Sequence, residues 1–120
     1  MKRVLVIDDQ PEIRELIRMT LEIENLEVHE AGDGSEGLAC ALRLRPDLVL
    51  LDVMMPGALD GFAVCQRLRD DATLRRTPVI MLTSKTEAAD RRRGLESGAS
   101  AFLTKPFSPR QLLSVVDRLA

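Results

Sequence analysis

The stretch VLVIDDQPE, residues 4–12, sets the pattern for the whole chain. Four apolar residues run directly into two adjacent carboxylates, Asp8 and Asp9, and Pro11 stands where the first turn of a helix would accept it. An apolar run bounded by polar residues favours a strand buried on both faces, as in a parallel sheet. Two like charges at the end of such a strand indicate that a positive group lies beside them.

The same alternation of a short strand and a helix continues to the end of the chain. The expected strands are residues 3–7, 26–31, 47–52, 78–83 and 100–104. The expected helices are residues 12–24, 35–44, 60–70, 86–97 and 109–119. Five such units favour a single α/β domain over residues 1–120, a doubly wound, flavodoxin-like (βα)5 parallel sheet with strand order 2-1-3-4-5. Residues 26–31 alternate in polarity, which is typical of an edge strand.

The composition is that of one soluble domain. The chain has 120 residues, of which 45% are apolar and 30% charged, with a net charge of −2. This length suits one core, and the charge does not favour direct nucleic-acid binding. No apolar run approaches the roughly 20 residues of a membrane span. Cys40 and Cys65 lack metal-type spacing, so we expect two buried thiols in a reducing cytoplasm.

Polar side chains follow the central strands at the point where each strand ends. They are Asp8, Asp9, Asp52, Thr83, Ser84 and Lys105. The carboxyl ends of parallel strands share one edge of the sheet, so we expect these side chains to converge there. Close carboxylates repel by roughly 4 kcal/mol per pair, and one lysine does not offset three of them. Either a carboxyl stays protonated or a divalent cation binds, and oxygen ligands without His or Cys favour Mg²⁺.

A metal ion, a carboxylate, a hydroxyl and a lysine together suit phosphoryl transfer. A carboxylate can act as the nucleophile and become an aspartyl phosphate. The cation and the lysine would neutralise the transferring group, while the hydroxyl hydrogen-bonds its oxygens. Asp52 is the best candidate nucleophile because it stands alone at its strand end.

Four stretches together resemble the receiver domain of bacterial two-component response regulators. They are VLVIDDQPEIRELI, PDLVLLDVMMPG, PVIMLTS and GASAFLTKPFS, and the resemblance covers essentially the whole chain. It implies that Asp52 is the phosphoacceptor and that Asp8 and Asp9 form the acidic pair for Mg²⁺. It further implies that Asp9 binds the ion directly, that Asp8 binds it through water, and that the Met54 carbonyl completes the protein ligands.

The resemblance also implies a switch. Thr83 would be the switch hydroxyl, Lys105 would pair with the phosphoryl group, and Phe102 would fill the space that Thr83 leaves. Phosphorylation would then alter the surface formed by the fourth helix, the fifth strand and the fifth helix. The family often has a cis peptide between Lys105 and Pro106. Met54 and Lys85 flank the site and are expected to tune the lifetime of the phosphorylated form.

The implied partners are proteins. The phosphodonor would be a sensor histidine kinase or a phosphotransfer protein, because His29, the one histidine, lies among polar neighbours of an edge strand. The recipient of the signal would be a downstream protein or an output domain. The domain would be a phosphoacceptor signalling domain that assists its own phosphorylation and dephosphorylation, as a monomer or a phosphorylation-dependent homodimer.

Two departures from the family pattern concern surfaces. DVMMPGALDG, residues 52–61, holds one residue more than the common form, after Pro56 and before Asp60. Ser100 and Ala101 replace an acidic pair that related regulators carry before the aromatic residue, which weakens the case for a charge-paired dimer.

The fourth predicted helix is the least apolar of the five. Its expected apolar face is only Ala88, Ala89 and Leu95, with Gly94 inside the helix. Arg91 to Arg93 form a run that is either a solvated face or a surface for a partner. Few apolar contacts suit an element that moves.

Three other interpretations compete with this one. GDGSEG, residues 32–37, matches a dinucleotide-binding glycine pattern. However, Asp33 and Glu36 would repel a pyrophosphate, and Gly32 and Gly34 are better interpreted as turn residues. A phosphatase of the haloacid-dehalogenase type would need an acid at position 54 or 10, where Met54 and Gln10 stand. A receiver that acts without phosphorylation would lack a key residue, and none is missing.

Overall fold

The central element of the fold is a five-stranded parallel sheet with the order β2-β1-β3-β4-β5, as the sequence predicts. The computed structural model describes residues 2–84 and 88–119. The strands are β1 (Arg3–Ile7), β2 (Glu27–Ala31), β3 (Leu48–Asp52), β4 (Val79–Thr83) and β5 (Ala101–Thr104). The helices are α1 (Pro11–Ile23), α2 (Gly34–Leu44), α3 (Gly61–Asp70), α4 (Ala88–Ser97) and α5 (Pro109–Leu119).

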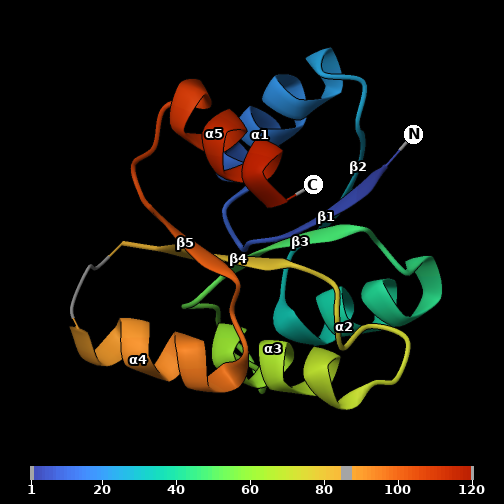
Figure 1. Cartoon of the computed structure of the whole chain (residues 1–120), viewed down its shortest axis with the longest axis vertical. Helices are drawn as coiled ribbons and strands as arrows, with labels where there is room; N and C mark the ends of the chain where they lie inside the picture. Colours follow the sequence, from blue (N-terminus) through green and yellow to red (C-terminus); the bar gives the residue numbers. More distant parts are fainter. Residues whose placement is uncertain (1, 85–87, 120) are drawn as a thin grey trace.

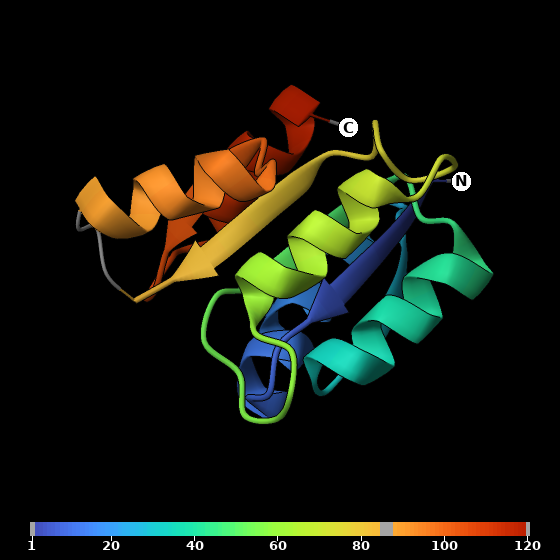
Figure 2. The ribbon, with the colours of Figure 1, turned by 90° about the horizontal axis from the view of Figure 1, so that it is seen from below.

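Helices cover both faces of the sheet (Figure 1). Helices α1 and α5 lie together on one face, and α2, α3 and α4 lie on the other. Viewed from below, these three helices run side by side across the sheet in chain order (Figure 2). None of the helices within residues 2–84 and 88–119 has the length and apolar character of a membrane span.

The central strands are buried on both faces, which explains their continuous apolar sequences. Every residue of β3 and of β4 is buried. Side chains at odd positions of these strands, such as Leu51 and Met81, pack toward α2 and α3. Side chains at even positions, such as Leu50 and Leu82, pack toward α1 and α5. The sheet therefore separates two cores, and the polar side chains of β3 and β4 stand only at the carboxyl ends of these strands.

Two acids cap helices α2 and α3, which lie on the same face of the sheet. Asp60 accepts a hydrogen bond from the Ala63 amide at 2.9 Å, as expected for an N-cap of α3. Asp33 does the same for α2 through the Glu36 amide at 2.8 Å. The prediction that Gly34 is a turn residue is wrong, because it is the first residue of α2. A Cβ atom there would lie 2.3 Å from the Leu59 carbonyl oxygen, so glycine permits close packing of the β3–α3 loop.

Helix α4 packs differently from its prediction. The expected apolar face of Ala88, Ala89 and Leu95 is wrong: both alanines are exposed and Leu95 is 62% exposed. The buried positions are Gly94 and Ser97. The reason is the ring of Phe102 on β5, which would lie 2.5 Å from a Cβ atom at position 94. Residues 86 and 87 of the predicted helix lie outside the described residues.

Candidate functional site

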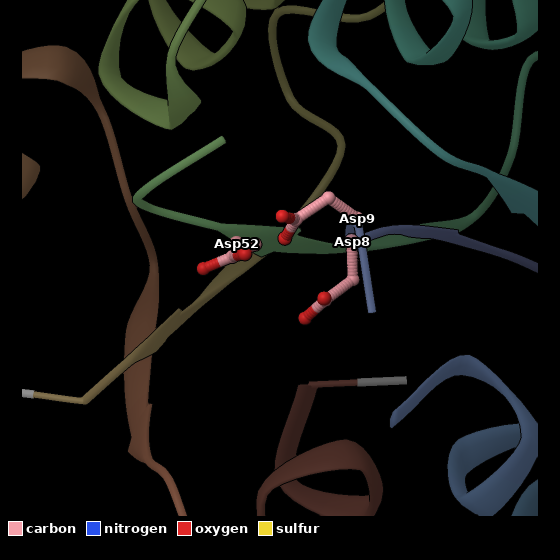
Figure 3. Close-up of side chains that lie close together, drawn as sticks. All are labelled: Asp8, Asp9 and Asp52. Carbon is pink, nitrogen blue, oxygen red and sulfur yellow. The ribbon is translucent and has the colours of Figure 1, made fainter. Parts of the chain in front are cut away.

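The strand register brings three carboxylates to one point of the sheet edge. Ile7 pairs with Leu51, so Asp8 follows directly beside Asp52. Asp8, Asp9 and Asp52 each offer a carboxylate oxygen, and these oxygens all lie within 4.8 Å of one another. Figure 3 shows the two acids leaving the end of β1 in different directions, with Asp52 facing them from the end of β3. The convergence predicted from the sequence is therefore present.

Asp8 is the most enclosed of the three acids. Its residue is 0% exposed. One carboxylate oxygen, Oδ1, accepts a hydrogen bond from the Gln10 amide at 2.8 Å. The other, Oδ2, receives no hydrogen bond of good geometry from the described residues. Its close neighbour is the ammonium group of Lys105, with 2.7 Å between Nζ and Oδ2. A buried anionic oxygen with so little hydrogen bonding is a suitable ligand for a cation.

The oxygen donors fit a hard divalent ion. Asp8 and Asp52 are buried while Asp9 is exposed, so the cluster is open to solvent on one side. No histidine or cysteine belongs to this cluster within the described part of the chain. Carboxylates from separate strands, with room for water, match the coordination that Mg²⁺ prefers. The donor set therefore fits Mg²⁺ and does not favour a softer metal.

The surroundings of Asp52 disfavour the ionised form of its carboxyl group. Burial and the neighbouring charge of Asp8 raise the pKa of Asp52 to about 7, although Lys105 acts in the opposite direction. The Lys105 ammonium lies 3.5 Å from Asp52 Oδ2. The Met54 amide donates to Asp52 Oδ1 at 3.3 Å. A nearby divalent cation would favour the ionised, nucleophilic form of Asp52.

The remaining predicted residues surround an open cleft of about 320 Å³ at the same edge. Its lining residues are Asp9, Gln10, Asp52, Val53, Met54, Thr83, Ser84 and Lys105. Thr83 ends β4 and is buried. It also borders a narrow crevice that Phe102 lines from β5, together with Arg91 of α4. The hydroxyl and the aromatic ring are thus close enough for motion of one to affect the other.

Strand β3 is packed tightly against the next helix, α3. The Gly61 amide donates to the Val53 carbonyl at 3.0 Å. A Cβ atom on Gly61 would lie 2.3 Å from the carbonyl oxygen of Asp52. Helix α3 can therefore begin beside Asp52 only because residue 61 has no side chain.

Sequence reasoning missed two residues that contact the acids or their lysine. Gln10 accepts a hydrogen bond from Lys105 Nζ at 3.0 Å, and Arg14 donates to the Asp8 carbonyl at 2.7 Å. The one signal for Arg14 is its place on α1, between Ile13 and Ile17 at the margin of the buried stripe. The peptide between Lys105 and Pro106 is cis. Lys85 lies outside the described residues.

The glycine-rich segment does not form a phosphate cradle. The Asp33 side chain accepts the hydrogen bond of the Glu36 amide at the start of α2. The Gly32 amide points to the Glu36 carboxylate, with 3.4 Å between nitrogen and Oε2. Two of the amides that a pyrophosphate would use, those of Gly32 and Glu36, are thus already paired with acids, which argues against the dinucleotide interpretation.

Comparison with known proteins identifies the class. Residues 4–117 match the family described as the response regulator receiver domain. The chain is 45% identical to the DNA-binding dual master transcriptional regulator RpaA of Synechocystis over 119 residues, which are 99% of this chain and 49% of that protein. The chain thus belongs to the receiver-domain family, and it spans about half the length of this relative.

Two solved structures share the fold. The chemotaxis response regulator CheY4 of Vibrio cholerae has a TM-score of 0.95 and 37% identity, covering 100% of this chain and 99% of that one. The receiver domain of the sensor histidine kinase PA1611 from Pseudomonas aeruginosa has a TM-score of 0.90 and 30% identity, covering 98% and 96%. The latter structure is described as having a magnesium ion coordinated in its active-site cleft.

Proposed function

We propose that residues 1–120 form a receiver domain that accepts a phosphoryl group on Asp52 in a Mg²⁺-dependent reaction. The observation that carries this proposal is the meeting of Asp8, Asp9 and Asp52 with the ammonium group of Lys105 at one edge of the sheet. The donor is a phosphohistidine of a sensor kinase or a phosphotransfer protein. Membership in the receiver family supports this donor class.

In the transfer step, an oxygen of Asp52 attacks phosphorus. The new O–P bond forms while the N–P bond to the donor histidine breaks, and its electron pair returns to the imidazole nitrogen. Lys105, already 3.5 Å from Asp52, neutralises charge on the transferring oxygens, and the Thr83 hydroxyl hydrogen-bonds one of them. Mg²⁺, when bound, supplies positive charge to the same oxygens. Its protein ligands would be Asp8, Asp9, Asp52 and the Met54 carbonyl, with Asp8 acting through water.

The signal leaves the site through Thr83 and Phe102. Movement of Thr83 toward the phosphoryl group opens space in the crevice that Phe102 lines. Phe102 also lies against Gly94 of α4, so its ring couples β5 to that helix. The α4–β5–α5 surface then acts on a downstream protein or an output domain. The domain works in the cytoplasm, as a monomer or as a homodimer that forms on phosphorylation, and it assists its own dephosphorylation.

Incubation with acetyl phosphate and Mg²⁺, followed by intact-mass analysis, tests the proposal. The wild-type chain should gain the mass of one phosphoryl group, and peptide mapping should place it on Asp52. Asp52→Asn should gain none, and labelling should also fail in EDTA. Asp117→Asn, which changes an exposed acid on α5, is the matched control and should be labelled like the wild type. Full labelling of Asp52→Asn would refute the assignment.

A further inference from the structure

The backbone at Asp8 is held from two sides. Its amide donates to the Ala31 carbonyl of β2 at 3.1 Å. Its carbonyl accepts from Arg14 Nη1 at 2.7 Å. Because the peptide bond is planar, the orientation of the Asp8 carbonyl also sets the position of the Asp9 amide and Cα atom. The contact with Arg14 therefore bears on the direction in which both acids leave β1.

Arg14 is itself oriented by an acidic side chain that lies farther from the candidate metal site. Its Nε atom donates to Glu30 Oε1 on β2 at 3.0 Å, and its side chain is 20% exposed. Burial opposes ionisation of Glu30, but the hydrogen bonds and positive charges of Arg18 and Arg14 together outweigh burial and lower the pKa of Glu30. The planar guanidinium thus bridges a fixed carboxylate and the main chain of the metal site. A forked group suits this task, since it can hold two acceptors at once.

Arg18 provides an internal comparison one helical turn away. Its Nε atom donates to Glu30 Oε2 at 2.6 Å, and Nη1 pairs with Glu22 at 3.0 Å. Both arginines therefore lie on α1 and bind the same carboxylate. Of these two arginines, only Arg14 contacts Asp8 among the described residues.

We propose that Arg14 is a positioning residue for the Mg²⁺ site. By fixing the Asp8–Asp9 peptide, it sets the separation of the two carboxylates before the ion arrives. This inference rests on the proposed function, because it assumes that the acids bind Mg²⁺. Outer contacts of metal ligands typically contribute about 10- to 100-fold to metal affinity, which sets the expected effect.

The sign of the effect separates positioning from simple electrostatics. Loss of a cation beside three carboxylates would, through its field alone, tighten Mg²⁺ binding. Loss of a positioning contact weakens binding instead. Arg14→Met and Arg18→Met each remove one positive charge and one partner of Glu30 while keeping an unbranched stem. Only Arg14→Met removes the donor to the Asp8 carbonyl, whereas Arg18→Met also removes the ion pair with Glu22.

The test is titration calorimetry of the full chain with MgCl₂. We expect the dissociation constant of Arg14→Met to rise about 10-fold and that of Arg18→Met to change little. The Mg²⁺ concentration that gives half-maximal labelling by acetyl phosphate should rise for Arg14→Met by the same factor as the dissociation constant. Arg14→Lys keeps the charge but loses the fork. It should weaken Mg²⁺ binding in the same direction, and it replaces Arg14→Met if that variant does not fold.

Two outcomes overturn the inference and leave the proposed function intact. One is unchanged or tighter Mg²⁺ binding by both Arg14 variants. The other is equal weakening in Arg14→Met and Arg18→Met. A wild-type chain that binds no Mg²⁺ would instead overturn the proposed function, and this inference with it.

Discussion

The proposed role of Asp52 as a nucleophile conflicts with its surroundings in the absence of a cation. A nucleophile must be ionised, yet burial and the charge of Asp8 raise the pKa of Asp52 to about 7. The native protein therefore binds the Asp52 proton more tightly than the unfolded chain does, and the protonated form favours folding. This contribution is fully present below pH 3.8, the ordinary value, and is lost as the pH rises through about 7.

The metal-free protein should consequently lose stability between pH 4 and pH 8. The contribution of Asp52 is at most about 4 kcal/mol, because each tenfold change in proton affinity corresponds to about 1.4 kcal/mol. Urea unfolding in EDTA at several pH values measures it. Asp52→Asn should have a flatter profile and exceed the wild type in stability at pH 8. Parallel profiles for the two proteins would contradict this expectation.

The sequence predicted that the candidate site residues at strand ends converge, and it missed Gln10 and Arg14 beside them. Asp52, Thr83 and Lys105 follow apolar runs, so the topology alone places them together. No such pattern indicates Gln10 or Arg14. Gln10 pairs with a lysine 95 residues away, and Arg14 pairs with a main-chain carbonyl. Hydrogen bonds of this kind depend on side-chain orientation, which a sequence pattern does not specify.

Helix α4 is joined to its neighbours by arginines lying on aromatic rings. The Arg93 guanidinium lies 4.4 Å from the ring centroid of Phe62 on α3 and 3.8 Å from Asp60, the N-cap of that helix. The Arg91 guanidinium lies 5.0 Å from the ring centroid of Phe102 on β5. The arginine run is thus an exposed face of which two members, Arg91 and Arg93, also contact aromatic rings on neighbouring elements.

Arg93→Ala should loosen α4. The expected loss in the free energy of unfolding is about 0.5–1 kcal/mol, the usual contribution of an exposed cation–π contact. Hydrogen exchange of the α4 amides should accelerate more than that of α2. Arg92→Ala is the control, because that side chain has no ion pair or ring contact with the described residues. Equal exchange rates in the two variants would show that Arg93 does not restrain the helix.

The boundaries of helices and strands were predictable because acids, prolines and glycines stand at the ends of the apolar runs. β1 begins and ends where predicted, and α5 does as well. The packed face of α4 was not predictable in the same way. Hydrophobic periodicity pointed to Leu95, whereas the contact depends on the missing side chain of Gly94. A pattern of apolar residues does not indicate a contact that depends on a position without a side chain.

Folding of the chain assembles the proposed metal ligands. Asp8 and Asp52 lie 44 positions apart in the sequence and meet only through the pairing of β1 with β3. The unfolded chain has no such cluster, so an ion that binds the acids stabilises the native state by mass action. The strand order that creates this meeting was predictable from five units, right-handed crossovers and chain length.

Mg²⁺ should therefore raise the melting temperature of the wild-type chain. At a concentration one hundred times the dissociation constant, the gain is about 2.7 kcal/mol. Asp9→Ala should abolish the gain while leaving the metal-free protein folded, because Asp9 is exposed. Calorimetry with MgCl₂, with KCl matched in ionic strength as control, measures it. An equal rise in Asp9→Ala would place the ion elsewhere.

The buried thiols give this molecule an unusual means of observation. The chain contains no tryptophan or tyrosine, so its intrinsic fluorescence reports almost nothing. Cys40 and Cys65 lie in α2 and α3, and burial raises the pKa of the Cys65 thiol. Cys65 is 0% exposed and Cys40 is 8% exposed, so an alkylating reagent should reach Cys65 only when α3 separates from the sheet. The rate of Cys65 modification thus measures that opening, and it reports nothing about α1 and α5 on the opposite face of the sheet.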